Sequence, residues 1–274
     1  MTGTTAPRIP AQPGPKDTVL LRADHLGKTF GSGDRAFKAV DDVSLSVAPG
    51  EILGIVGESG SGKSTTAKMI LGLLTPDSGT VTFEGADLAT RSKREMRRLR
   101  ARLQVVPQNP QTSLNPRLTI ASSMEFNMRA HGIPADERSR RVHDLLERVG
   151  LTAAHAARYP HEMSGGQLQR VAIARALSTD PRLVICDEAV SALDKSVQAQ
   201  VLNLLADLQR DTGVAFVFIS HDLAVVEHIS DTVVVLYRGQ VVESGVASEV
   251  WAHPQHEYTA ALLAATPGRS LFAA

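Results

Sequence analysis

The stretch GESGSGKST at residues 57–65 constrains the fold more than any other part of the chain. It satisfies the pattern G-x-x-x-x-G-K-[ST]. The apolar run EILGIVG precedes it, and a helical pattern follows it from Lys63 to Leu74. A strand, a glycine-rich loop and a helix in this order predict a phosphate-binding loop in an α/β fold.

The residue types in this loop suit the chemistry of a bound phosphate. Glycines allow backbone N–H groups to turn inward around an anion. We expect Lys63 to neutralise phosphate charge and the hydroxyl of Ser64 to coordinate Mg²⁺. The predicted nucleotide-binding residues of the loop are Gly57, Glu58, Ser59, Gly60, Ser61, Gly62, Lys63, Ser64 and Thr65.

The amino-acid composition argues against a nucleic-acid-binding, disulfide-bonded or membrane-spanning protein. The 274 residues include 29 basic and 29 acidic side chains, so no net charge attracts nucleic acid or anionic lipid. The single cysteine, Cys186, excludes an internal disulfide and fits a reducing cytosol. No apolar run approaches the roughly 20 residues that cross a bilayer. We therefore expect one folding unit that is made and kept inside the cell.

The pattern of the chain indicates its domain organisation. Residues 1–17, rich in Pro, Gly, Thr and Ala, are expected to be a disordered leader. Strands alternating with helices predict a mixed, mainly parallel sheet with an antiparallel β portion. Residues 109–164 contain no convincing strand, which predicts a helical subdomain inserted between two core segments, 18–108 and 165–245. Residues 246–274 are expected to form a C-terminal tail segment.

Two apolar strands end in residues that could act on a phosphate. LVICDE ends in Asp187 and Glu188, and VAFVFISH ends in His221. The carboxyl ends of parallel strands line the ligand crevice, so Asp187 can reach Mg²⁺ there. Glu188 is the candidate base for a hydrolytic water, and His221 could donate to a γ-phosphate oxygen. Acidic strand ends and single histidines are common, and only the preceding phosphate loop favours the functional interpretation.

The stretch HEMSGGQLQR at 161–170 predicts a helix that begins after Ser164. Ser164 and Gln167 have the spacing of a capping box, and such an open helix start attracts anions. A cap alone does not explain Gly165 and Gly166, since each glycine costs roughly 1 kcal/mol in a helix. The stretch is therefore a second candidate phosphate site.

Gln108, after the strand QVVP, and Asp194, at the end of SALD, are unremarkable in isolation, and Asp194 could simply cap the next helix. The order of all these stretches is specific. Phosphate loop, glutamine, SGGQ, acidic strand, SALD and histidine follow in a register that resembles the nucleotide-binding subunits of ABC transporters over residues 19–245.

The resemblance implies a P-loop NTPase (RecA-like) α/β domain over residues 18–267 that hydrolyses ATP with Mg²⁺. It also implies that two such domains pair head to tail, so that the serine-glycine helix of one closes on ATP held by the phosphate loop of the other. Phe30 then resembles the aromatic residue that stacks on adenine. Ser164, Gly165, Gly166 and Gln167 resemble the signature, and Asp194 the cross-dimer contact.

The remaining roles also follow from the resemblance. Gln108 resembles the lid-hinge residue that senses Mg²⁺ and the membrane partner, and His221 resembles the γ-phosphate clamp. The resemblance thus implies catalytic roles for Glu188, His221 and Gln108, and metal contacts from Ser64, Gln108 and Asp187.

Several sequence segments that ATP chemistry does not require resemble those of the ATPase subunits of oligopeptide, dipeptide and nickel importers. They are QNPQTSLNPRLTI, RYPHEMSGGQ, SALDKSVQAQV and HPQHEYTAALLAATP. Glu257, in the last segment, stands where proline is usual. The resemblance implies transmembrane permease subunits, a second identical or related ATP-binding subunit and, indirectly, an external substrate-binding protein as partners, at the cytoplasmic face of the membrane and without nucleic acid.

Two other functions are possible on the same motifs. One is a soluble ABC ATPase of DNA repair or translation, but such proteins generally have a long coiled-coil insertion or two ATPase domains in one chain, and neither pattern is present. The other is an ATP-binding regulatory subunit without turnover. The presence of Lys63, Asp187, Glu188 and His221 argues against it.

Overall fold

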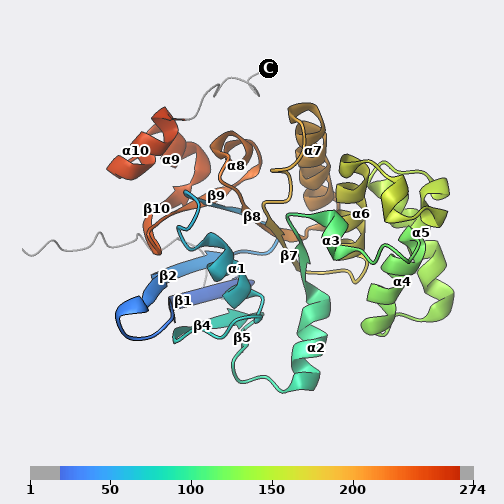
Figure 1. Cartoon of the computed structure of the whole chain (residues 1–274), viewed down its shortest axis with the longest axis horizontal. Coiled ribbons are helices and arrows are strands. Elements are labelled where there is room, and N and C mark those ends of the chain that lie inside the picture. Colours follow the sequence, from blue (N-terminus) through green and yellow to red (C-terminus); the bar gives the residue numbers. More distant parts are fainter. Residues whose placement is uncertain (1–18, 266–274) are drawn as a thin grey trace, which may run out of the picture.

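A six-stranded sheet organises the computed structural model, which describes residues 19–265 (Figure 1). The expected leader at 1–17 lies outside the described residues. The strand order is β10-β9-β3-β8-β7-β6, and every neighbouring pair is parallel except β10 with β9. The strands are β3 (Ile52–Val56), β6 (Leu103–Val106), β7 (Leu183–Asp187), β8 (Ala215–Ile219), β9 (Thr232–Tyr237) and β10 (Gln240–Val246).

A second sheet is antiparallel and has the order β2-β1-β4-β5. Its strands are β1 (Leu21–Phe30), β2 (Phe37–Val47), β4 (Ser78–Phe83) and β5 (Ala86–Asp87), and the short 3-10 helix η2 (Gly33–Arg35) joins β1 to β2. The prediction of a mainly parallel sheet with an antiparallel β portion is therefore confirmed.

Both faces of the six-stranded sheet are covered, which is why its central strands are apolar throughout. Successive residues of β8 alternate between two apolar clusters. Phe216 and Phe218 belong to a cluster shared with the helices, and Val217 and Ile219 belong to one shared with the four-stranded sheet and the helix after β3. Asp187 and Glu188, at the end of β7, are only half-buried.

The helix after β3, α1 (Lys63–Ile70), is shorter than the sequence predicts. The apolar pattern continues to Leu74, but Gly72 has a φ of 62° and ends the helical conformation. The N–H groups of Leu73 and Leu74 then bond back to the carbonyl of Lys68. A glycine in the left-handed region therefore overrides the apolar periodicity.

Residues 109–164 contain helices and turns and no strand. In Figure 1 these elements lie on the side of β7 away from α1. The predicted stripe Val142, Leu145, Leu146 and Val149 is buried. The elements are α3 (Pro110–Ser113), α4 (Ile120–Ala130), α5 (Ala135–Arg148), η3 (Ala153–Ala157) and η4 (Pro160–Glu162), preceded by the charged α2 (Lys93–Arg102).

The remaining helices are α6 (Gly165–Leu177), α7 (Lys195–Thr212), α8 (Leu223–Ile229), α9 (Ala247–Ala252) and α10 (Glu257–Ala264). On α7 the sequence predicts a buried face of Val197, Val201, Leu204 and Leu208. Only Val201 and Leu208 are fully buried, together with Leu202 and Leu205. Because α7 contacts both α6 and α8, it buries a broader face than one stripe. Within residues 19–265, no helix is both long and apolar enough to cross a membrane.

Candidate functional site

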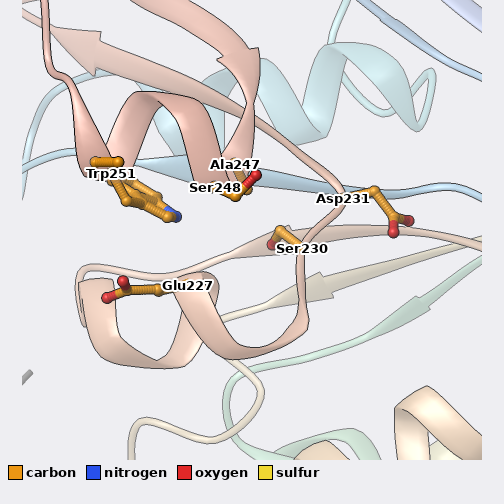
Figure 2. Close-up of a pocket in the computed structure, with 7 residues that line it drawn as sticks. Glu227, Ser230, Asp231, Ala247, Ser248 and Trp251 are labelled. Atoms are coloured by element: carbon orange, nitrogen blue, oxygen red, sulfur yellow. The ribbon is translucent and has the colours of Figure 1, made fainter. Parts of the chain in front are cut away.

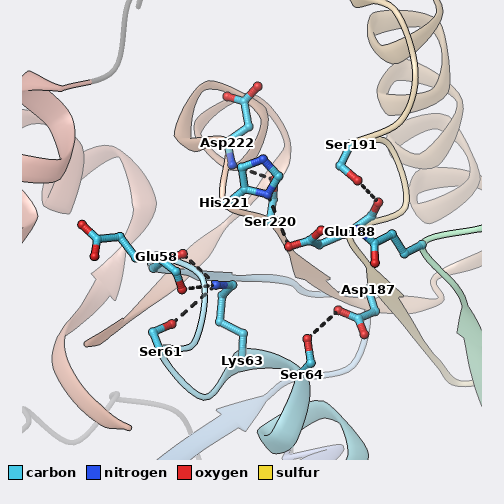
Figure 3. A network of polar contacts seen from close by, with 12 residues as sticks. Glu58, Ser61, Lys63, Ser64, Asp187, Glu188, Ser191, Ser220, His221 and Asp222 are labelled. Carbon is cyan, nitrogen blue, oxygen red and sulfur yellow. Dashed lines mark hydrogen bonds and ion pairs between the residues drawn. The ribbon is translucent and has the colours of Figure 1, made fainter. Parts of the chain in front are cut away.

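The carboxyl ends of four parallel strands bring most of the predicted residues together. The strand β3 leads into the phosphate loop, β6 leads to Gln108, β7 ends at Asp187 and Glu188, and β8 leads to His221. These strands are neighbours in the order β3-β8-β7-β6. Figure 3 shows the acidic pair and His221 facing the phosphate loop. The sheet topology therefore builds the site from segments far apart in the sequence.

Lys63 lies inside the loop that it belongs to. Its ammonium group donates hydrogen bonds of 2.7 Å to the carbonyl oxygens of Gly57 and Glu58, and the residue is 5% exposed (Figure 3). Burial lowers the pKa of Lys63, and the charges of Glu188 and Asp187 partly oppose this effect. A partly desolvated cation at the floor of a glycine loop favours a bound anion such as phosphate.

Two glycines of the loop are required by space and by backbone conformation. Gly57 has a φ of 147°, and a Cβ there would lie 2.1 Å from the carbonyl oxygen of Leu236. Gly62, which precedes α1, has a φ of 103°, and a Cβ would lie 2.6 Å from the carbonyl oxygen of Ala39. Any side chain at these places would push the loop away from β2 and β9, so these two glycines set its position.

Asp187 and Ser64 offer oxygen ligands beside the loop. The Ser64 hydroxyl lies 3.5 Å from a carboxylate oxygen of Asp187. Burial raises the pKa of Asp187, and the neighbouring charge of Glu188 raises it further, while Lys68, Ser64 and Lys63 lower it. A cation near this carboxylate would favour its ionised form.

These donors fit Mg²⁺, which prefers hard oxygen ligands and is usually held by one or two carboxylates together with substrate phosphates. Residues 19–265 contain no group of three His, Cys, Asp or Glu side chains arranged to hold a metal by themselves. The residues that could contribute are Ser64, Asp187 and Gln108, which suits an ion that arrives with a nucleotide.

Glu188 has partners on both carboxylate oxygens. The side-chain amide of Gln108 donates a 2.6 Å hydrogen bond to Oε2, and Nδ1 of His221 lies 3.3 Å from Oε1. The backbone of Glu188 has a φ of 48°, a left-handed conformation that is uncommon for a residue with a side chain. The hydroxyl of Ser191 donates to the Glu188 carbonyl at 2.9 Å and supports this turn. The turn aims the carboxylate at the phosphate loop rather than along the strand (Figure 3).

A pocket of about 230 Å³ adjoins the phosphate loop. Phe30 lines it, and so does Phe37, which the sequence pattern does not single out. The two are cross-strand partners in the β1–β2 hairpin, and both are well exposed. Pairing the two strands on either side of the loop GSGDRA would have placed Phe37 beside Phe30. The pocket is lined by Phe30, Phe37, Ala39, Ser59, Gly60, Gly62, Lys63, Ser64, Thr65 and Glu188.

Ser164 begins α6 with the predicted capping box. Its hydroxyl accepts a hydrogen bond from the Gln167 N–H at 3.3 Å, and the Gln167 side chain accepts one from the Ser164 N–H at 3.1 Å. A Cβ at Gly166 would lie 2.6 Å from Val197, so this glycine allows α6 to pack against α7. A Cβ at Gly165 would meet nothing within 4 Å. Gly166 is therefore needed for packing against α7, whereas a side chain at Gly165 would meet none of the described residues.

The predicted residues do not all meet at one place. The pocket beside the phosphate loop is lined by none of Ser164 to Gln167, and Figure 1 shows α6 and α1 on opposite sides of β7. Asp194 caps α7 by accepting a 2.9 Å hydrogen bond from the N–H of Val197. Its cross-dimer role stays a prediction.

A larger pocket of about 580 Å³ lies elsewhere, between α8 and α9 (Figure 2). It contains none of the residues predicted from the motifs. Size alone does not identify the site, because the phosphate loop and the acidic strand end supply the chemistry. The larger pocket is lined by Glu227, Ser230, Asp231, Ala247, Ser248, Trp251 and Ala252.

Comparison with known proteins agrees with this geometry. Residues 40–191 match the family described as ABC transporter. A Brucella ovis protein named as a peptide import ATP-binding protein is 48% identical over 252 residues, which cover 92% of this chain and 80% of that protein. The glutathione import ATP-binding protein GsiA of Escherichia coli K12 is 52% identical over 234 residues, which cover 85% of this chain and 38% of GsiA.

Two solved structures share the fold. CbiO1 from Clostridium perfringens, described as part of the ABC transporter complex cbiONQ, aligns with a TM-score of 0.78 at 28% identity, over 86% of this chain and 92% of CbiO1. The ATP-binding cassette MJ0796, solved as a dimer in a post-hydrolysis state with ADP and Pi, aligns with a TM-score of 0.75 at 29% identity, over 83% of this chain and 98% of MJ0796.

Proposed function

Since the chain belongs to the ABC transporter family and is an ATPase that uses ATP and Mg²⁺, we propose that it is the ATP-hydrolysing subunit of a peptide importer. The relatives named for import of peptides and of glutathione, which is itself a small peptide, support this cargo class. A related small cargo such as nickel belongs to the same branch by resemblance.

The observation that carries the proposal is the convergence of Lys63, Glu188 and His221 at adjacent strand ends. In the proposed reaction, Lys63 and the loop N–H groups hold the phosphates of ATP. Glu188 accepts a proton from the attacking water, whose oxygen bonds to the γ-phosphorus as the bond to ADP breaks. The products are ADP and inorganic phosphate.

The neighbours of Glu188 prepare it for this step. Gln108 binds one carboxylate oxygen and His221 approaches the other, which fixes the orientation of the base before ATP arrives. His221 can also donate to a γ-phosphate oxygen from this position. Mg²⁺, when bound, neutralises phosphate charge and polarises the phosphate oxygens. Ser64, Asp187 and Gln108 are the residues proposed to hold it.

The adenine end of the nucleotide is proposed to stack on the aromatic residues of the hairpin, Phe30 and Phe37. Both rings are exposed, and both line the pocket that contains Lys63 and Ser64. Exposed aromatic faces beside a phosphate site are suited to stacking on a base.

A second subunit is proposed to complete the site. The start of α6 lies away from the phosphate loop of its own chain, and no atom of residues 19–265 outside the backbone of that helix lies within 4 Å of a Cβ built at Gly165. A helix N-terminus carries about +0.5 charge, which favours an anion such as a γ-phosphate. ATP held between the phosphate loop of one subunit and Ser164 to Gln167 of another would therefore join the two subunits, and hydrolysis would release them.

The remaining partners and the location follow from the importer proposal. The subunit acts at the cytoplasmic face of the membrane on separate permease subunits, with a substrate-binding protein outside. The alternative of a soluble ATPase in DNA repair or translation is disfavoured by the import relatives. A regulatory subunit without turnover is disfavoured because Lys63, Asp187 and Glu188 are all in place.

The test of the proposed function is isolation of the assembly. The tagged Glu188→Gln chain is extracted from native membranes in mild detergent with ATP and Mg²⁺, and the co-purifying chains are identified by mass spectrometry. Two permease subunits in stoichiometric amounts, absent from a parallel preparation of the untagged chain, are the expected result. Soluble nucleic-acid or ribosomal partners without a membrane protein would contradict the importer proposal while leaving the ATPase chemistry intact.

The cargo is tested by reconstitution of the purified assembly in vesicles with its binding protein. ATP-dependent uptake of labelled di- or oligopeptides is expected. Uptake of nickel and not of peptides would show that the cargo is nickel, which importers of the same branch also carry by resemblance.

A further inference from the structure

A side chain of the C-terminal tail contacts the phosphate loop directly. The backbone N–H of Glu58 donates a 3.2 Å hydrogen bond to the hydroxyl oxygen of Tyr258, which lies 200 residues further along the chain in α10. Glu58 is the second residue of the loop. The contact therefore joins the last helix that the structure describes to the cradle for the nucleotide.

Glu58 is held at both of its backbone polar groups. Its carbonyl accepts the 2.7 Å hydrogen bond from the ammonium group of Lys63, and its N–H is bound by Tyr258. The same carbonyl accepts from the N–H of Ser61 at 3.2 Å. A shift of the Glu58 peptide would therefore move a partner of Lys63 as well. The hydroxyl of Tyr258 and the ammonium of Lys63 act on one residue of the loop.

The segment that carries Tyr258 is itself anchored. The carboxylate of Glu243, in β10, accepts backbone hydrogen bonds from Gln255 at 2.8 Å and from His256 at 3.2 Å. His256 then caps α10 by accepting a 3.1 Å hydrogen bond from the N–H of Tyr258. The tail is thus fixed to the edge of the sheet just before the tyrosine.

The ring of Tyr258 is held separately from its hydroxyl. It lies 4.1 Å from the ring of Tyr237, centroid to centroid, at an interplanar angle of 31°. Thr259 and Leu263, on the same helix, are buried. Burial raises the pKa of Tyr258, so its hydroxyl remains protonated and accepts from Glu58 through a lone pair. The ring supplies packing, and the oxygen supplies the contact with the loop.

We propose that Tyr258 is a positioning residue for nucleotide binding, which sets the phosphate loop and Lys63 in their binding geometry through the N–H of Glu58. The proposal rests on the assignment of nucleotide binding to residues 57–65. It gives the C-terminal tail a role in the ATP site, because loss of the tail's anchor at Glu243 would release the same hydrogen bond.

The first test replaces Tyr258 with phenylalanine, which removes the hydroxyl and keeps the ring. Amide hydrogen exchange is measured on the full-length chain without nucleotide, and MgATP affinity is measured by calorimetry. We expect faster exchange at Glu58 and a rise in the Kd and KM for MgATP of about 2–10-fold, the scale of one hydrogen bond. The value of kcat should change much less, because the residue does not touch the reacting atoms.

The control variant is Tyr159→Phe, which removes a hydroxyl from a half-exposed tyrosine outside the site. It should leave exchange at Glu58 and MgATP affinity unchanged. The second variant, Glu243→Ala, acts on the tail without touching the loop and should change both quantities in the same direction as Tyr258→Phe.

The outcomes separate this inference from the proposed function. If the unmodified chain binds MgATP and Tyr258→Phe matches it in both exchange and Kd, the positioning role is wrong. If only Glu243→Ala weakens binding, packing of the tail positions the loop and the hydroxyl does not, which also overturns the proposal. Failure of the unmodified chain to bind MgATP would instead overturn the assignment of the loop.

Discussion

The side-chain amide of Gln108 donates a 2.6 Å hydrogen bond to the carboxylate of Glu188, although 80 residues separate them in the chain. The contact spans two neighbouring strands, because Gln108 follows β6 and Glu188 follows β7. It links the start of the helical insertion to the proposed catalytic base. A movement of the insertion that shifts Gln108 would therefore alter its hydrogen bond to the Glu188 carboxylate.

Replacing Glu188 with glutamine should lower ATP turnover by about 10²–10⁴-fold, because a positioned base contributes on this scale. Glutamine keeps the shape of the side chain, so the Kd for MgATP should stay close to that of the unmodified chain. Steady-state hydrolysis and calorimetric binding measure the two quantities. Glu147→Gln, on the exposed face of α5, is the control. Near-normal turnover in Glu188→Gln would remove Glu188 from the role of base.

Replacing Gln108 with alanine should lower kcat by less than the loss of Glu188 itself, because Gln108 acts on the base. The two effects should not add. Once glutamine replaces Glu188, removal of Gln108 should cost little more, since residues in contact act as a unit. A double-mutant cycle on kcat, measured at saturating Mg²⁺ so that the proposed metal contact of Gln108 does not limit the rate, tests this. Additive losses would mean that Gln108 acts independently of the carboxylate.

Replacing Ser164 with alanine should have two separable effects. Loss of the cap should cost about 1 kcal/mol of stability. The rate of ATP hydrolysis should fall by more than the loss of folded protein explains, because the proposed role of Ser164 lies in the partner's site. Binding of MgATP by the isolated chain should be preserved for the same reason. Thermal unfolding measures the stability, calorimetry measures MgATP binding, and a hydrolysis assay at a concentration that supports dimers measures turnover.

The matched control for Ser164 is Ser92→Ala. Ser92 caps α2 with the same capping box, in which its hydroxyl accepts from the N–H of Glu95 at 3.3 Å. This variant should lose comparable stability and keep full hydrolysis. If Ser164→Ala abolished binding of MgATP to the isolated chain, the cross-subunit role would be wrong.

Replacing Asp187 with asparagine should make the nucleotide-free protein at least as stable at neutral pH and should abolish stabilisation by MgATP. The pKa of Asp187 is raised in the fold by burial and by Glu188, so the folded state retains its proton more strongly than the unfolded state. Ionisation of Asp187 therefore costs stability as pH rises from the ordinary carboxyl pKa of 3.8 through the folded pKa.

Thermal unfolding of Asp187→Asn and of the unmodified chain is compared across this pH window without nucleotide. The difference in Tm should grow with pH in favour of the variant and then level off. A variant that loses stability at neutral pH would show that the carboxylate stabilises the empty site.

The sequence was sufficient for the parts of the site that depend on local chemistry. The loop at 57–65, the acidic end of β7 and the cap at Ser164 each follow from residue type and spacing, and they lie on the predicted elements. The chain order of the strands does not give their order in the sheet. It was the resemblance, and not the pattern alone, that grouped Gln108 with Glu188 and His221.

The features that the sequence does not predict depend on contacts between different segments of the chain. Phe37 is not predicted from the sequence because its place beside Phe30 depends on the register of a hairpin. The contact between Tyr258 and Glu58 has no local signal at all. Glu257 illustrates the opposite case. It is the first residue of α10, a position that suits an acidic residue as well as a proline, so the departure from the usual pattern leaves the helix intact.

The separation of α1 from the start of α6 has a genetic consequence. If each working site takes its phosphate loop from one chain and its serine from another, two different defective chains can complement each other. A pair of one Lys63→Ala chain and one Ser164→Ala chain holds one site with both defects and one site with neither. Cells that express both variants should recover part of the uptake that each variant alone lacks, whereas a site contained within one chain would allow no recovery.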